Sequence, residues 1–142
     1  MNVNVTWRGE ACFEAETGSG HKILMDGPPD HGGENRGARP METLLTGVSG
    51  CSAFDVVHIL QKSRQKVTGC VAKVSAERAE EVPAVFTKIH LHFVVSGQDL
   101  REAAVKRAVE MSAEKYCSAS IMLSKAGVEL THSFEIGETP PI

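Results

Sequence analysis

Apolar and polar residues alternate in three short segments near the start of the chain. These segments are NVTWRG (residues 4–9), CFEAET (12–17) and HKILMD (21–26), and turn residues such as GSG at 18–20 separate them. Alternation bounded by turns is typical of short strands joined by hairpins. We therefore expect a small three-stranded sheet, followed by a loop, GPPDHGGENRGA (27–38), that is long enough to be mobile or to line a site.

The stretch from Arg39 to Leu60 predicts a long helix. Pro40 suits the first helical position, and Glu42 in the first turn is favoured by the helix dipole. Apolar residues then spread around most of the circumference, at Leu44, Leu45, Val48, Phe54, Val56, Val57, Ile59 and Leu60. Such a helix is buried on nearly all sides. In a chain of 142 residues that arrangement favours a homodimer, with the helix at the subunit interface.

This helix also contains two glycines, Gly47 and Gly50, and each costs a helix about 1 kcal/mol relative to alanine. They lie among the small residues Ser49, Ser52 and Ala53, next to a cysteine at position 51. Small residues let a second backbone approach closely. We therefore expect the glycines to make room for a close neighbour beside that cysteine.

The remaining pattern predicts two long strands, two helical segments and a last strand. The strands are VTGCVAKVSAER (67–78) and VFTKIHLHFVVSG (85–97), and the second alternates well, with Ile89, Leu91, Phe93 and Val95 on one face. A helix over 99–117 is preceded by Asp99 and Glu102 in capping-box spacing, and a continuation over 118–127 ends at Gly127. With a final strand over 128–137, this order predicts one α+β domain over residues 1–142, with helices on a mainly antiparallel sheet.

Composition narrows the classes of function. Apolar residues make up 42% and charged residues 23% of the chain, as in ordinary globular proteins. The net charge of −3 gives no basic surplus for nucleic acid. The first residues lack signal-peptide order, and no uninterrupted apolar run approaches the roughly 20 residues of a membrane span. We therefore expect a cytoplasmic protein, in which cysteines stay reduced.

The four cysteines fall into two groups. Cys12 and Cys70 lie in strand patterns, where cysteine behaves as a small hydrophobe. Cys51 and Cys117 follow small or polar residues in a helix or at a helix end, and they are the candidates for thiol chemistry. Cys51 lies too far into its helix to gain from the helix dipole, so a reactive thiolate there needs a cation or donor from elsewhere. Asp55, four residues on, is a candidate perturber of its pKa.

The histidines give a weaker pattern. His90 and His92 share one face of a predicted strand, a spacing that a metal site can use. No cysteine or carboxylate accompanies them at ligand spacing, which favours the solvent face of an amphipathic strand. His58, seven residues after Cys51, would lie about 10 Å along the helix, too far to activate the thiol directly. We expect His132 to be structural, and we expect no resident metal or cofactor.

Two segments, RPMETLLTGVSGCSAFDVV (39–57) and SAEKYCSASIML (112–123), together resemble the OsmC-like family of osmotically inducible and organic hydroperoxide resistance proteins. The resemblance covers essentially the whole chain. It is strongest to the YhfA-type branch, through HKILMDG, DVVHILQK and MSAEKYC. It implies an intertwined α+β homodimer with two active sites at the subunit interface.

The resemblance also implies a reaction. In characterised members the first cysteine attacks an organic hydroperoxide, becomes a sulfenic acid and then forms a disulfide with the second cysteine. By position these residues would be Cys51 and Cys117. A dithiol reductant, often a lipoyl-bearing protein, restores the thiols. A neighbouring thiol protects the sulfenic acid from further oxidation.

Two positions depart from the peroxidase pattern. Peroxidase members place a glutamate directly after the helix-leading proline, whereas this chain has Met41 there and Glu42 one residue later, rotated by about 100°. The thiolate-binding arginine has no clear counterpart, and Arg36 and Arg39 are the nearest candidates. The candidate site is therefore Cys51, Cys117, Glu42, Arg39 and Arg36. Two alternatives stay open: a non-catalytic dimer whose apolar pocket is lined by Cys51, and a metal-binding protein using the two strand histidines.

Overall fold

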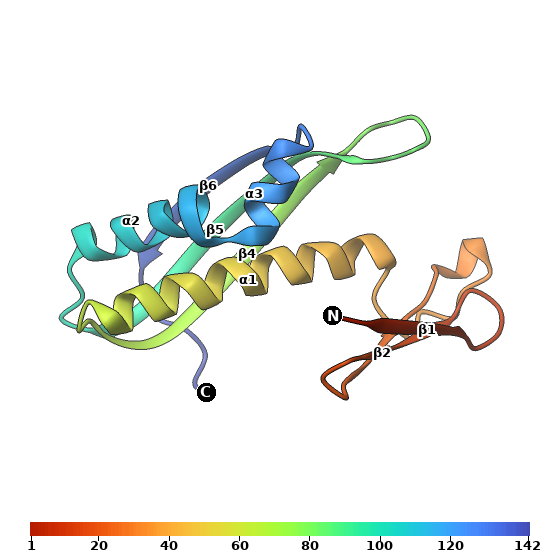
Figure 1. Ribbon diagram of the computed structural model, residues 1–142, viewed down its shortest axis with the longest axis horizontal. Coiled ribbons are helices and arrows are strands. Elements are labelled where there is room, and N and C mark those ends of the chain that lie inside the picture. The colour runs from red at the N-terminus through yellow and green to blue at the C-terminus, as the bar shows by residue number, and fades with distance from the viewer. The chain divides into compact units, whose positions relative to one another are not determined.

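The computed structural model describes all 142 residues, which divide into two compact units, Met1–Thr46 and Gly47–Ile142. The first unit contains an antiparallel sheet of three strands, β1 (Val3–Trp7), β2 (Phe13–Thr17) and β3 (Lys22–Met25), in the order β1-β2-β3 (Figure 1). A single 3₁₀ turn, η1 (Pro29–His31), follows β3. The hairpin strands predicted from alternation are confirmed within two residues at each end.

The loop after β3 is organised by one buried carboxylate, Asp26. Its oxygens accept hydrogen bonds from the backbone N–H groups of Gly27 (2.8 Å), Glu34 (3.1 Å) and Arg36 (3.0 Å). The Nε of Arg36 donates a further bond at 3.4 Å. The pKa of Asp26 is lowered, chiefly by the N–H of Arg36, because these donors favour the ionised form. These hydrogen bonds hold the loop between Asp26 and Arg36 in a defined conformation.

Helix α1 (Pro40–Lys62) begins in the first unit and continues into the second. The backbone N–H of Arg39 donates to Glu42 Oε2 at 2.9 Å, and the N–H of Thr43 donates to the Arg39 carbonyl. Glu42 thus satisfies an otherwise unpaired donor at the helix start.

Only one stripe of α1 is buried within the chain, and its members at four-residue spacing are Val48, Ser52, Val56 and Leu60. Phe54, by contrast, is 69% exposed. The sequence predicted burial on nearly all sides, and a single chain does not provide it. By length and composition alone, α1 also qualifies as a membrane span, because it has 23 residues and contains an 18-residue window with a mean hydropathy of 1.4. The absence of an uninterrupted apolar run did not exclude this. The core helix of a soluble protein passes the same test.

The second unit is built on a three-stranded sheet, β4 (Lys66–Arg78), β5 (Phe86–Gln98) and β6 (Glu129–Ile136). Strands β4 and β5 are antiparallel, whereas β5 and β6 are parallel. The parallel pair follows from the connection through α2 (Glu102–Met111), the π-helical turn η2 (Ser112–Tyr116) and α3 (Ser118–Lys125). The predicted α+β class with mainly antiparallel sheets is confirmed, and β5–β6 is the one parallel strand pair.

Helix termini in this unit test two local predictions. The predicted capping box is wrong: Asp99 has φ 53°, and α2 starts after Arg101 without a side-chain cap. The N–H of Arg101 instead donates to Gln65 Oε1 at 3.0 Å, because the chain turns sharply out of β5. The predicted end at Gly127 is confirmed. Gly127 has φ 99°, in the left-handed region that terminates helices, and Val128 N–H bonds back to the Leu123 carbonyl.

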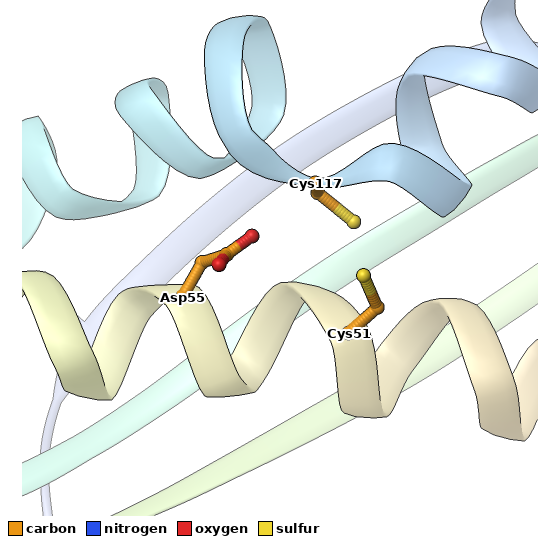
Figure 2. A group of neighbouring side chains, drawn as sticks. All are labelled: Cys51, Asp55 and Cys117. Atoms are coloured by element: carbon orange, nitrogen blue, oxygen red, sulfur yellow. The ribbon is translucent and has the colours of Figure 1, made fainter.

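The alternating face of β5 forms the core of the second unit, with Ile89, Leu91, Phe93 and Val95 all buried. Helix α2 adds Val105 and Ala108, which are fully buried. The segment that joins η2 to α3 lies alongside the middle of α1 (Figure 2). Polar side chains meet at that contact rather than apolar ones.

Candidate functional site

Cys51 and Cys117, which are 66 positions apart in the chain, meet in the second unit. Their sulfur atoms and a carboxylate oxygen of Asp55 all lie within 4.8 Å of one another. Figure 2 shows the two sulfurs pointing toward each other, with Asp55 one turn further along α1. The i,i+4 spacing places Cys51 and Asp55 on one face of the helix. The predicted pair is therefore brought together, and Asp55 joins it.

Cys117 occupies the N-cap of α3, in extended backbone conformation between η2 and α3. Its Sγ accepts a hydrogen bond from the backbone N–H of Ser120 at 3.4 Å. A second donor, the hydroxyl of Ser52, lies at 3.1 Å. The side chain is fully buried. Two donors and a helix N-terminus all favour negative charge on this sulfur.

Three buried serines surround the buried sulfur, and sequence inspection did not single them out as functional. Ser52 and Ser120 hydroxyls lie 3.1 Å apart, and Ser112 Oγ donates to the Ser52 carbonyl at 3.3 Å. Each serine is at most 1% exposed. The available signal was their spacing, since Ser52 adjoins one candidate cysteine and Ser120 lies three residues after the other. That spacing is the one at which an N-cap side chain receives an N–H bond.

The surroundings of the two thiols shift their pKa values in opposite directions. Burial raises the pKa of Cys51, and the neighbouring Cys117 and Asp55 raise it further, while the Ala119 N–H acts in the opposite direction. For Cys117, burial also acts to raise the pKa. The hydrogen bonds from Ser120 and Ser52 outweigh burial, so the pKa of Cys117 is lowered. We therefore place the first negative charge of the pair on Cys117.

Asp55 is an unusual member of this cluster. Its Oδ2 is buried and has no hydrogen-bond partner. Burial raises the pKa of Asp55, while His58 and a hydrogen bond with Ser112 partly offset the shift. A carboxyl group next to two thiols, with one oxygen unpaired, holds a proton more readily than an exposed one.

The two sulfurs differ in accessibility. Cys51 is partly exposed, whereas Cys117 has 0% exposure. A reagent from solvent therefore reaches Cys51 first. The remaining cysteines match expectation, because Cys12 is buried in the first unit and Cys70 is partly buried in β4.

The other predicted site residues, Glu42, Arg39 and Arg36, belong to the first unit, where their polar groups are engaged. Glu42 caps α1. The guanidinium of Arg39 donates to Asn35 Oδ1 at 2.9 Å and to the Asp26 carbonyl at 3.3 Å. Arg36 pairs with Asp26. All three therefore stabilise the loop and helix start around Asp26.

The strand histidines are bound by hydroxyl groups. His90 contacts Thr131 Oγ1 at 2.6 Å and Ser133 Oγ at 2.8 Å, and His92 contacts the same serine at 2.8 Å. The set of three potential metal donors in the second unit is Cys51, Asp55 and Cys117 and includes neither histidine. Three protein donors are too few for a structural zinc site, whereas a catalytic zinc uses three. His132 is stacked on Phe93, as expected of a structural residue.

Comparisons with family profiles, known sequences and solved structures all match this chain over most of its length. The sequence profile of the OsmC-like protein family matches residues 32–133. Protein YhfA of Escherichia coli strain K12 is 52% identical over 136 residues, covering 96% of this chain and 98% of that protein. A hypothetical protein of Aquifex aeolicus VF5 has a TM-score of 0.83 at 34% identity, covering 98% of this chain and 97% of its own. An organic hydroperoxide resistance protein OsmC of Legionella pneumophila shares the fold, with a TM-score of 0.71 at 17% identity and coverage of 96% and 98%.

Proposed function

Because this chain belongs to the OsmC-like protein family, we propose that it reduces organic hydroperoxides through Cys51 and Cys117. One observation carries the proposal: two sulfurs within 4.8 Å of each other, one partly exposed and one fully buried. That arrangement suits a thiol that meets the oxidant and a second thiol that captures the product. The name of the Legionella protein, an organic hydroperoxide resistance protein, supports the substrate class.

The proposed reaction has two steps. The thiolate of Cys51 attacks the terminal oxygen of the hydroperoxide, the O–O bond breaks, and Cys51 becomes a sulfenic acid while the alkoxide leaves and takes up a proton. The sulfur of Cys117 then attacks Cys51 Sγ, forms the disulfide and releases hydroxide, which is protonated to water. Two electrons pass from the thiol pair to the peroxide. A dithiol reductant, such as a lipoyl-bearing protein, returns the disulfide to two thiols by exchange.

The ionisation of Cys51 limits the first step. A free thiol with a pKa near 8.5 is only slightly ionised at neutral pH, and the pKa of Cys51 is raised by burial, Cys117 and Asp55. We therefore expect slower peroxide reduction than in family members that carry the arginine and glutamate. Arg36 and Arg39 remain the proposed sources of positive charge for the thiolate.

We also propose that the protein works as a homodimer in the cytoplasm. The exposed apolar side chains of α1 support the dimer, because Leu44 is 54% and Phe54 is 69% exposed, and burying them against a second copy is favourable. A second copy packed on α1 would bury these side chains and enclose the thiol pair at the interface.

Variants exposed to cumene hydroperoxide test this function. Cys51→Ser should abolish peroxide consumption. Cys117→Ser should stall at sulfenic or sulfinic acid on Cys51, because no second thiol captures it. Arg36→Ala or Arg39→Ala should slow the reaction if that side chain holds the thiolate. Cys70→Ser serves as the matched control, because it removes a partly buried thiol outside the pair. Unchanged consumption in Cys51→Ser would reject the proposal.

The competing function is a non-catalytic dimer that binds a small molecule in an apolar pocket lined by Cys51. It agrees with the raised pKa of Cys51, which makes the thiol less reactive. It predicts that both thiols stay reduced in excess hydroperoxide. The same thiol count therefore decides between the two functions.

A further inference from the structure

Asp55 is the polar group of the cluster for which the two-step reaction above has no use. Its carboxyl lies within 4.8 Å of both sulfurs, and its Oδ2 is buried without a hydrogen-bond partner. Burying a carboxylate oxygen without a donor is costly, because water no longer solvates its charge. Asparagine would fit the same space without charge. A role in proton transfer explains why an acid at this position is useful.

The two-step reaction does not say which group accepts the Cys51 proton and which group protonates the alkoxide. Cys51 must lose its S–H proton before it attacks, and the alkoxide must gain one as the O–O bond breaks. An alkoxide is a far stronger base than a carboxylate and is a poor leaving group unless it is protonated. A single group beside the sulfur that accepts the first proton and returns it would serve both needs.

The groups that face Asp55 leave few candidates for this task. They are Cys51 and His58 on α1, Ser112 on η2 and Cys117 at the start of α3. The Cys117 thiolate, favoured by hydrogen bonds from Ser52 and Ser120, can accept a proton, but a protonated Cys117 could not attack the sulfenic acid in the second step. His58 lies seven residues from Cys51, about 10 Å along the helix axis. Asp55 is one turn from Cys51 and has a free oxygen.

We propose that Asp55 carries the proton during peroxide reduction: its carboxylate accepts the S–H proton of Cys51 and then donates it to the departing alkoxide. The carboxyl is ionised before and after the step, so no proton is gained or lost overall. The raised pKa of Asp55, caused first by burial, makes its carboxylate a better acceptor for the Cys51 proton. This inference rests on the proposed hydroperoxide reduction and adds a catalytic group to it.

The test compares Asp55→Asn with the wild type against three reagents. Organic hydroperoxide expels an alkoxide, which needs a proton. Peracetic acid expels a carboxylate, and iodoacetamide expels iodide, and neither leaving group needs one. Removing the Asp55 charge lowers the pKa of Cys51, so more thiolate is available. Alkylation at Cys51, followed by peptide mass spectrometry, should therefore become faster in the variant.

With cumene hydroperoxide we expect the opposite result, a rate of Cys51 oxidation lower by about 100-fold, the usual scale of general acid–base catalysis. With peracetic acid the variant should react at least as fast as the wild type. Glu110→Gln on α2 is the matched control, because it removes an exposed carboxylate outside the cluster and should change none of the rates.

The possible outcomes separate the inference from the function it rests on. Equal loss with all three reagents would show that Asp55 only maintains structure, and the inference would be overturned. An undiminished hydroperoxide rate in Asp55→Asn would overturn it as well, while leaving hydroperoxide reduction by Cys51 intact. A wild type that ignores hydroperoxide but is alkylated normally would reject the function itself, and the proton role with it.

Discussion

The hydroxyl of Ser52 donates a hydrogen bond to Cys117 Sγ at 3.1 Å, across the contact between α1 and the start of α3. Ser52 directly follows Cys51, so one helix supplies both the partly exposed thiol and a donor to the buried one. The bond joins the two elements that must stay aligned for a disulfide to form. It also favours the ionised form of the buried thiol.

Ser52→Ala tests this bond. The variant should raise the pKa of Cys117, because one donor to its sulfur is lost, and should lower the free energy of unfolding by about 1 kcal/mol. The pH dependence of Cys117 alkylation and urea denaturation measure the two effects. Ser112→Ala is the control, since its hydroxyl donates to a carbonyl rather than to sulfur. An equal pKa change in both variants would refute a specific role for Ser52.

Gly50→Leu tests the apolar face of α1. A Cβ built at Gly50 meets nothing within 4 Å in this chain and the residue is exposed, so a side chain can leave the backbone there without a clash, and leucine gains about 1 kcal/mol of helix propensity. We expect the subunit to remain folded and the dimer to weaken at least tenfold, because the larger side chain would occupy the space that the second subunit needs. Sedimentation at micromolar concentration measures the dimer, and Gly50→Ala provides a smaller change at the same position. A dimer of undiminished affinity would show that another face forms it.

Asp55→Asn should stabilise the protein at neutral pH. Burial raises the folded-state pKa of Asp55 above its unfolded value of about 3.9, so ionisation weakens the folded state. The destabilisation is absent below the unfolded pKa, grows as pH rises toward the folded pKa, and is constant above it. Urea denaturation at pH 4 and pH 7 should therefore show an advantage for the variant that is larger at pH 7. A variant less stable at pH 7 would mean that the carboxylate has a stabilising partner.

The fold was predictable from local patterns. The alternation around Phe93 identified β5, the turn residues separated the three N-terminal strands, and Gly127 marked the end of α3. Family membership, inferred from the two cysteine segments, is confirmed by the OsmC-like profile match and by 52% identity to YhfA. Such features are encoded by neighbouring residues, which a single sequence displays directly.

The parts that were missed depend on contacts between distant segments. The parallel pairing of β6 with β5 and the real start of α2 are set by how the chain returns to the sheet. The bond between Ser52 and Cys117 joins residues 65 positions apart. The resemblance implied that the first cysteine is the activated thiol. The structure gives Cys117, which caps α3, hydrogen bonds from Ser52 and Ser120, whereas Cys51 receives one from the backbone N–H of Ala119.

The most direct test of the central claim is the intact mass of the wild-type protein after treatment with cumene hydroperoxide, with a parallel count of free thiols. The account predicts a product lighter by two hydrogen atoms, with a Cys51–Cys117 disulfide in the peptide map and with Cys12 and Cys70 still reduced. A protein that keeps all four thiols in excess hydroperoxide would contradict the account and favour the non-catalytic binding dimer.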